Sequence, residues 1–341
     1  MLLAIHAAIV ALALTPLQQA QLLVVTTVRP GVFSGAAGIT FADQEGGTVK
    51  ALHDAPPFEP ARAYTSAAAA RAAGSATATA LHAAGVDVDF APVFDTADGP
   101  LGSREFARPS FAVAFARGLG RSACAKHFPG LGSAAISTDE RPHVDARIRP
   151  KDLAPYRAAI ANGLECVMVD QAFYGGAAYR ASLEPATYRL LRGLGFRGVA
   201  ITDSLSLVHD APVERWAPQA IRAGADMVLF TSPAHAQRAI RALLPLARRG
   251  ELLQHVERVL RFRRDERYNR ADRRRARSLT TVRPRLRSSD PARCAVRSTR
   301  FTVARDVPAR SAISSCVSGI TASPSSEAYS SASSSSRWRT R

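Results

Sequence analysis

The strongest constraint on the fold is a repeated alternation between short apolar runs and helix-like segments. Seven runs rich in Val, Ile, Leu and Ala alternate with segments rich in Ala, Leu and Arg; they cover residues 22–25, 39–42, 86–93, 123–128, 166–169, 199–202 and 227–230. Most are continuously apolar, which is typical of parallel strands covered on both faces. The alternation predicts an α/β fold and favours a (β/α)8 TIM barrel over an open doubly wound sheet. No glycine-rich dinucleotide fingerprint follows the first run.

The beginning of this pattern is shortened. Too few residues separate Val25 from Ile39 for the crossover that joins two parallel strands. Residues 30–35, which lie between them, are interpreted as the remnant of a strand. We therefore expect a barrel that is abbreviated at its N-terminal strands.

Capping residues indicate where two of the helices begin and end. Asp152 is expected to cap a helix over residues 153–162, which Gly163 ends. Ser182 is expected to cap a second helix, which runs to Arg192.

The positive charge is concentrated in the C-terminal part of the chain. The formal net charge is +17, and residues 261–341 alone carry 20 Arg against 6 Asp or Glu. The preceding residues are nearly neutral, so no nucleic-acid partner is expected for the folded part. Residues 265–341 are rich in Arg and Ser, lack apolar periodicity and are predicted to be disordered. A nucleic-acid-binding tail and an out-of-frame translation of a GC-rich gene are the alternative hypotheses.

Three segments are expected along the chain: an apolar N-terminal segment over residues 1–17, the barrel over 18–264 and the tail over 265–341. Thr15 and Pro16 are typical of the start of a helix, which predicts a buried first helix. Residues 1–14 also have the length of the apolar region of a signal peptide, although no Lys or Arg precedes them. They are too short to span a bilayer, and a cytoplasmic location is favoured over the cell envelope or secretion.

Charged residues follow five successive apolar runs at the same end of each run. They are Asp43, Asp95, the pair Lys126 and His127, Asp170 and Asp203. A single such Asp is often only a turn former. In a barrel, however, these strand ends meet at one opening, where active sites form. Carboxylates accept hydrogen bonds from sugar hydroxyls and suit glycosidic cleavage.

Metal binding is the competing use of such a ring of carboxylates. The histidines and the four cysteines show no metal-ligand spacing, so neither a metal nor an organic cofactor is expected. Cys124 and Cys166 lie in apolar runs and are predicted to be core residues.

Seven motifs, taken in order, resemble the N-terminal barrel of glycoside hydrolase family 3, and in particular the single-domain bacterial β-N-acetylhexosaminidases. The resemblance spans roughly residues 18–262 and rests on Asp43-Gln44-Glu45-Gly46-Gly47, Asp89-Phe90-Ala91-Pro92-Val93, Lys126-His127-Phe128-Pro129-Gly130-Leu131-Gly132, Val167-Met168-Val169, Leu191-Arg192-Gly193-Leu194-Gly195-Phe196-Arg197-Gly198, Thr202-Asp203-Ser204-Leu205-Ser206 and Ala223-Gly224-Ala225-Asp226-Met227-Val228-Leu229.

The resemblance implies a role for five residues. Asp203 matches the nucleophile, which forms a covalent glycosyl-enzyme in a retaining double displacement. Lys126 and His127 match residues that bind sugar hydroxyls, and Asp43 matches the carboxylate that holds the distal hydroxyls of the same sugar. Arg104 matches a substrate-binding arginine.

The sequence departs from the family where the general acid/base is expected. The hexosaminidases use an Asp-Ser-His on the loop after the Lys-His-Phe-Pro-Gly motif, and an ungapped count puts Ser137-Thr138-Asp139 there. Asp139, Glu140 and His143 lie close by in the sequence, and Asp139 and His143 are the candidates for the missing function. Leaving-group protonation typically contributes a factor of about 10²–10⁴ in rate.

The function expected from the resemblance is a retaining hydrolase of terminal β-linked N-acetylhexosamine, with a carbohydrate substrate of cell-wall origin and a place in peptidoglycan turnover. One alternative is a catalytically impaired barrel that acts as a sugar-binding or interaction protein. A second is a β-glucosidase, although that group often takes its acid/base from another domain.

Overall fold

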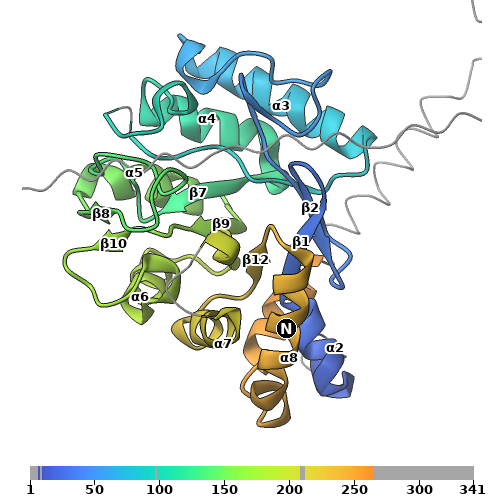
Figure 1. The fold of residues 1–341 in the computed structure, drawn as a ribbon. Helices are drawn as coiled ribbons and strands as arrows, with labels where there is room; N and C mark the ends of the chain where they lie inside the picture. Colours follow the sequence, from blue (N-terminus) through green and yellow to red (C-terminus); the bar gives the residue numbers. More distant parts are fainter. Residues whose placement is uncertain (1–6, 8–9, 97, 208–211, 264–341) are drawn as a thin grey trace, which may run out of the picture. The chain divides into compact units, whose positions relative to one another are not determined.

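The computed structural model describes residues 7, 10–96, 98–207 and 212–263, in which most strands belong to two sheets (Figure 1). The first sheet has the order β12 (Val228–Phe230), β1 (Val24–Arg29), β2 (Val32–Gly35), β3 (Thr40–Ala42) and β6 (Val88–Asp89). The second has the order β11 (Val199–Thr202), β9 (Cys166–Val169) and β7 (Cys124–Phe128). Two small pairs join β4 (Gln44–Gly46) to β5 (Val49–Lys50) and β8 (Asp145–Ala146) to β10 (Phe173–Tyr174).

Helices lie around the two sheets (Figure 1). They are α2 (Pro16–Leu22), α3 (Ala67–Ala83), α4 (Pro109–Leu119), α5 (Pro150–Ala161), α6 (Pro185–Gly193), α7 (Val213–Ala223) and α8 (Pro233–Arg248). Five of these begin with Pro at the first helical position, where its missing N–H removes no helical hydrogen bond.

The predicted apolar runs are confirmed as strands. Two of them, over residues 166–169 and 199–202, coincide with β9 and β11, and every residue in both strands is buried. Burial at consecutive positions means that both faces of these strands are covered, which is why the runs are apolar without alternation.

The expected strand remnant at residues 30–35 is β2, which runs antiparallel to both of its neighbours, β1 and β3. An antiparallel neighbour needs only a short turn, whereas a parallel one needs a long crossover. The hairpin therefore explains how so few residues can join Val25 to Ile39.

The predicted (β/α)8 TIM barrel is not confirmed, because the described strands do not form one closed barrel. In the part of the chain that the structure describes, only isolated parallel bridges link the two sheets, at Asp89–Ala123, Val93–Lys126 and Ile201–Met227. β6 has only two residues, and beyond it the backbone contact with β7 continues through single hydrogen bonds, from the Cys124 N–H to the Ala91 carbonyl oxygen and from the Lys126 N–H to the Pro92 carbonyl oxygen. The fold is a mixed α/β structure in which every strand of the two main sheets except β2 shares one direction.

Two predicted helix caps are wrong by a few residues. Asp152 is not the N-cap of α5 but its third residue, where its carboxylate accepts a hydrogen bond from the Arg149 backbone N–H at 2.9 Å. Ser182 lies in a short 3-10 turn, and Glu184 caps α6 instead. In both cases the proline at the first helical position sets the start of the helix.

Thr15 caps α2 as predicted, since its Oγ1 accepts a hydrogen bond from the Gln18 N–H at 3.3 Å. Most of residues 1–9 and the whole predicted tail at 265–341 lie outside the described residues. Within the described part of the chain, no helix has the length and apolarity needed to cross a membrane.

Two glycines let α3 and α4 approach closely. A Cβ on Gly74 would lie 2.3 Å from the Phe115 carbonyl oxygen, and one on Gly118 would lie 2.1 Å from the Arg71 carbonyl oxygen. Both distances are far below van der Waals contact, so the helix pair depends on the absence of side chains at these positions.

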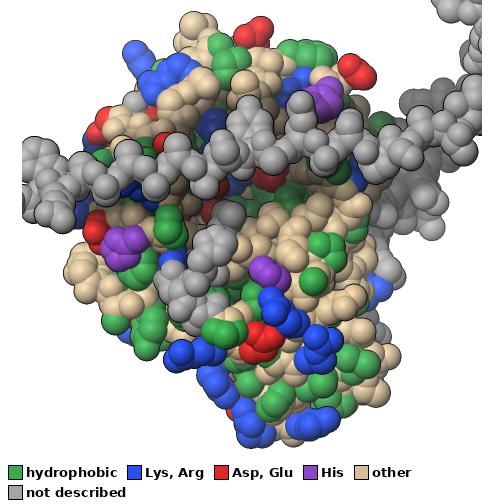
Figure 2. Space-filling view, viewed as in Figure 1, with side chains coloured by type: hydrophobic (Ala, Val, Ile, Leu, Met, Phe, Trp, Pro, Cys, Tyr) green, Lys and Arg blue, Asp and Glu red, His purple; other side chains and the backbone are tan. Residues whose placement is uncertain are grey.

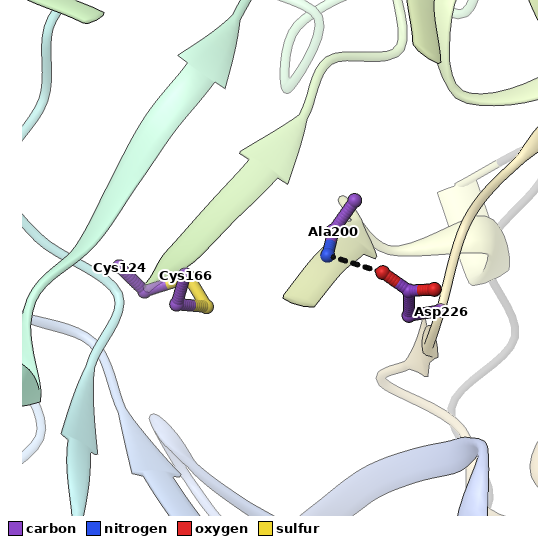
Figure 3. The surroundings of a disulfide bond; sticks show 4 residues. All are labelled: Cys124, Cys166, Ala200 and Asp226. Carbon is purple, nitrogen blue, oxygen red and sulfur yellow. Dashed lines mark hydrogen bonds between the residues drawn. A yellow bond between two sulfur atoms is a disulfide. The ribbon is translucent and has the colours of Figure 1, made fainter. Parts of the chain in front are cut away.

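Cys124 and Cys166 are fully buried, as predicted for core residues, and they also form a disulfide, which was not predicted (Figure 3). They occupy paired positions on the neighbouring strands β7 and β9. Their Cα atoms are 4.4 Å apart. The bond joins segments 42 residues apart in the sequence.

Asp226 is a buried carboxylate at the start of β12. It accepts hydrogen bonds from the Ala200 N–H at 3.0 Å (Figure 3) and from the side chains of Arg192 and Arg258, each at 2.6 Å. The ring of His255 lies 3.2 Å away. Burial raises the pKa of Asp226, but the hydrogen bonds and charges of these partners outweigh burial, so the net shift of the pKa is downward. This cluster ties α6 and the end of the described chain to the sheet.

Basic side chains gather over α7 and α8 in the lower part of Figure 2, with acidic side chains among them. Several form exposed ion pairs: Arg222 and Arg249 contact Glu251 at 3.1 and 2.5 Å, and Arg238 contacts Glu214 at 3.5 Å. Pairs of this kind contribute little to stability, because water and salt screen them.

Candidate functional site

The predicted strand-end residues come from strands that run in one direction. Asp43 follows β3, Lys126 and His127 lie near the end of β7, and Asp203 follows β11. β7 also bends here, because its pairing with β9 shifts between Ala125 and Phe128. The common direction places these residues at the same edge of the sheets.

A cluster of alternating charges surrounds Lys126. The Lys126 Nζ lies 2.7 Å from Asp43 Oδ1 and 2.7 Å from Glu45 Oε1. Arg104 binds both oxygens of Glu45, each at 2.8 Å, and its third contact is Asp139 Oδ2 at 3.2 Å. The structure therefore brings together Asp43, Arg104, Lys126 and Asp139, which the sequence analysis selected separately.

The charges in this cluster stabilise one another. Burial lowers the pKa of Lys126, but Asp43 and Glu45 outweigh this effect and the net shift is upward. Burial raises the pKa of Glu45, but Lys126 and Arg104 outweigh it and the pKa is about 2. Both groups are therefore charged at neutral pH, although their side chains are only 4% and 3% exposed.

His127 is held by a carboxylate that also holds the following loop. Its Nδ1 lies 2.8 Å from Asp95 Oδ2, and its backbone N–H donates to the same oxygen at 3.2 Å. The other oxygen of Asp95 accepts a hydrogen bond from the Leu131 N–H at 2.6 Å. Burial lowers the pKa of His127, but Asp95 and, to a smaller extent, Asp203 outweigh it and raise the pKa.

Asp203 lies within electrostatic reach of this cluster. Burial raises its pKa, and the nearby carboxylate of Asp139 raises it further, while His127 and Lys126 act in the opposite direction; the net shift is upward. Its Oδ1 accepts a hydrogen bond from the Ser204 N–H at 2.6 Å. A carboxylate held in this way beside the Lys126 cation and the His127 ring can act as a nucleophile.

The two candidates for the acid/base occupy different surroundings. Asp139 contacts Arg104 and is 55% exposed. His143 is 64% exposed, pairs with Asp145 at 3.4 Å and stacks on Phe173 with the ring centres 4.2 Å apart. The contacts of His143 are therefore with the β8–β10 pair, whereas Asp139 lies with the charged cluster.

Sequence reasoning assigned no role to two residues that organise the site. Glu45 lies in the Asp43–Gly47 motif, but only Asp43 was selected from it; Asp95 was recognised only as a strand-end residue. Both are at most 5% exposed. A carboxylate in such a buried stretch needs a cationic partner, and this requirement could have indicated both residues.

A pocket of about 930 Å³ lies beside this site rather than on it. Its walls include Gly132, Ser133 and Ala134 from the loop after β7, together with Asp98 and Arg149. The candidate site residues do not line it. Among the described residues, no group of three or more His, Cys, Asp or Glu side chains is arranged to hold a metal ion.

Comparisons with known proteins indicate the family of this chain. The family model described as "Glycosyl hydrolase family 3 N terminal domain" matches residues 31–262. The chain is 32% identical over 235 residues to the β-hexosaminidase of Stenotrophomonas maltophilia (strain K279a). The alignment covers 59% of this chain and 69% of that relative. The chain is 33% identical over 238 residues to the β-hexosaminidase of Alkalilimnicola ehrlichii, which covers 60% and 67% of the two chains.

Solved structures show the same similarity. The β-N-acetylhexosaminidase of Beutenbergia cavernae superimposes with a TM-score of 0.58 at 29% identity, covering 65% of this chain and 77% of that one. A family 3 β-N-acetylglucosaminidase from Paenibacillus sp. superimposes with a TM-score of 0.61 at 27% identity, covering 68% of this chain and 50% of that one.

Proposed function

This chain belongs to glycosyl hydrolase family 3, and we propose that it is a retaining hydrolase of terminal β-linked N-acetylhexosamine from cell-wall-derived amino sugars. Its β-hexosaminidase relatives support the class of enzyme. One observation supports the reaction most directly: Asp203 follows β11 at the same edge of its sheet as Lys126 and His127 near the end of β7.

In the proposed mechanism, Asp203 attacks the anomeric carbon and forms a covalent glycosyl-enzyme, which water then hydrolyses. The cluster around Lys126 holds the sugar. Asp43, which is 28% exposed, accepts hydrogen bonds from hydroxyls, and Arg104 and Lys126 donate to hydroxyl oxygens. Glu45 stays behind them and fixes both cations.

Of the two candidates for the acid/base, we assign leaving-group protonation to Asp139. Asp139 lies with Arg104 and is 55% exposed, so it can take a proton from solvent when it releases Arg104 and pass that proton to the leaving oxygen. His143 is occupied by Asp145 and Phe173. The absence of the family's Asp-Ser-His at residues 137–139 favours one second candidate, a sugar-binding protein with impaired catalysis.

We also propose that the two sheets derive from a barrel that is abbreviated at its N-terminal strands. The parallel bridges at Asp89–Ala123 and Ile201–Met227 lie where a complete barrel would continue its ladder.

A comparison of two substrates tests this function. One is an aryl N-acetyl-β-glucosaminide with a good leaving group, and the other is a natural-type disaccharide. Asp203→Ala should abolish the hydrolysis of both. Asp139→Asn should slow the disaccharide by about 10²–10⁴ and affect the aryl glycoside far less, because a good leaving group needs no proton. His143→Gln is the matched control and should resemble the wild type.

Other outcomes separate the alternatives. Sugar binding without hydrolysis of either substrate would support the binding protein. A large loss on the disaccharide in His143→Gln, but not in Asp139→Asn, would reassign the acid. A glycosyl adduct on a residue other than Asp203, detected by mass spectrometry of the intact protein, would contradict the assignment of the nucleophile.

A further inference from the structure

A buried hydrogen-bond chain lies beneath the candidate site. Asp170, which follows β9 and is fully buried, accepts a hydrogen bond from the Gln171 N–H at 2.6 Å through Oδ1. Its Oδ2 lies 2.5 Å from the Tyr174 hydroxyl. That hydroxyl also lies 3.1 Å from the carbonyl oxygen of Gly130, in the loop after β7.

The hydrogen bonds that join Asp170, Tyr174 and Gly130 need more protons than the Tyr174 hydroxyl alone can supply. A tyrosine hydroxyl has one proton to donate, but Tyr174 faces the Asp170 carboxyl and the Gly130 carbonyl at once. If Asp170 were ionised, it would take that proton and Gly130 would lose this bond. If Asp170 carries a proton, it donates to Tyr174, and Tyr174 donates to Gly130. Only the second arrangement satisfies both contacts.

We propose that Asp170 is a positioning residue that carries its proton as a neutral carboxylic acid in mildly acidic solution and, through Tyr174, holds the loop after β7 at Gly130. The same segment supports the other wall of the site, because the Gln171 side chain donates to the Asp203 carbonyl oxygen at 2.9 Å. The loop after β7 and the backbone that carries Asp203 are thus joined through Asp170 and its neighbour.

The electrostatic surroundings of Asp170 agree with this proton count. Burial raises the pKa of its carboxyl to about 7, although His127 and Tyr174 act to lower it. The titratable groups that face it are His127 from β7, Asp95 from the loop after β6, Asp203 from the loop after β11, Tyr174 from β10 and Tyr156 from α5. Loss of the Asp170 proton would add a negative charge beside the two carboxylates Asp95 and Asp203.

Two measurements test the hydrogen bonds that join Asp170, Tyr174 and Gly130 without any substrate. The first is the infrared band of a protonated carboxylic acid in the full-length protein, measured as the difference between the wild type and Asp170→Asn. The second is hydrogen exchange of the backbone amides of residues 130–132. The variants are Asp170→Asn, Asp170→Ala and Tyr174→Phe, with the half-exposed Tyr179→Phe as the control.

We expect the wild type to show the acid band at about pH 6 and to lose it at about pH 8.5. Exchange should be faster in Asp170→Ala and Tyr174→Phe. It should be rescued in Asp170→Asn, because an amide can donate to Tyr174 and accept from Gln171. An ionised Asp170 at about pH 6, or exchange in Asp170→Asn as fast as in Asp170→Ala, overturns the proposal.

A third readout rests on the proposed hydrolase function. On the aryl glycoside, Tyr174→Phe should lower kcat about tenfold, the equivalent of one lost hydrogen bond. Asp170→Asn should keep activity on the alkaline side, where the wild type declines. If no variant, including the wild type, hydrolyses the substrate, the proposed function fails, while the infrared and exchange results still decide the role of Asp170.

Discussion

At the scale of single residues, the site is built on charges that cannot be removed one at a time. Lys126 is enclosed by Asp43 and Glu45, and Glu45 in turn holds Arg104. The partners of a removed charge stay buried without compensation, and this costs more than the pair contributes. Two predictions follow from this arrangement.

The first concerns the cation. Lys126→Met should lower the free energy of unfolding by about 3–5 kcal/mol, because it leaves two carboxylates facing each other. Lys151→Met is the matched control; Lys151 is 54% exposed and pairs with Asp98, so its loss should cost at most about 1 kcal/mol. Urea unfolding measures both. Equal losses in the two variants would show that Lys126 is not enclosed as described.

The second concerns pH. The pKa of Glu45 is lowered from its usual 4.5 to about 2, so its ionic contribution to stability is present above about pH 4.5 and is lost as the pH falls through about 2. The stability difference between the wild type and Glu45→Gln should therefore shrink between about pH 6 and about pH 3. A difference that stays constant over this range would contradict the ionic role of Glu45.

At the scale of elements, the contact between α3 and α4 depends on glycine. Gly118→Ala should cost about 1–3 kcal/mol, because its Cβ would lie 2.1 Å from a backbone carbonyl that cannot rotate away. In Gly193→Ala, the control, the new Cβ would meet nothing within 4 Å, so that variant should be neutral or slightly stabilised. Thermal unfolding measures the stability of both variants. Equal unfolding temperatures for Gly118→Ala and Gly193→Ala would contradict the close packing of α3 and α4.

At the scale of the whole molecule, the disulfide between β7 and β9 closes a loop of 42 residues. Reduction, or the double substitution Cys124→Ala and Cys166→Ala, should lower the free energy of unfolding by about 2–4 kcal/mol. Alkylation of the unfolded protein, followed by mass spectrometry, establishes whether the bond is present beforehand. If the disulfide is present and its removal leaves the free energy of unfolding unchanged, the hydrogen bonds between β7 and β9 already fix these strands without it.

The parts of the fold that could be predicted are those that short stretches of the sequence indicate by themselves. β9 and β11 are continuous apolar runs, and residues 30–35 were recognised as the remnant of a strand, although not as the antiparallel strand that the structure shows. Ring closure could not be predicted, because it depends on pairing between segments far apart in the chain, such as Asp89 with Ala123 and Ile201 with Met227. The disulfide was missed for a related reason: two buried cysteines 42 residues apart reveal their pairing only once β7 and β9 are in register.

The candidate site was predictable only as far as its motifs extend. Asp43, Lys126, His127 and Asp203 each end a strand, so their common edge follows from the parallel direction. The link from Arg104 to Asp139 joins two loops, and loop geometry leaves no periodic signal. The separation of His143 from this cluster likewise depends on its stacking with Phe173, which the sequence around residue 143 does not indicate.

The reversed strand β2 divides the loops of this domain into two classes. The turn before it, at Gly31, belongs to the edge where Asp43 lies, since the Asp43 N–H donates to the Gly31 carbonyl oxygen at 2.9 Å. The turn after it, at residues 36–38, opens at the opposite edge, with residues 36 and 38 exposed. A fluorescent label or a short peptide tag inserted there would be remote from the sugar, which makes this turn a practical attachment point for immobilising the enzyme.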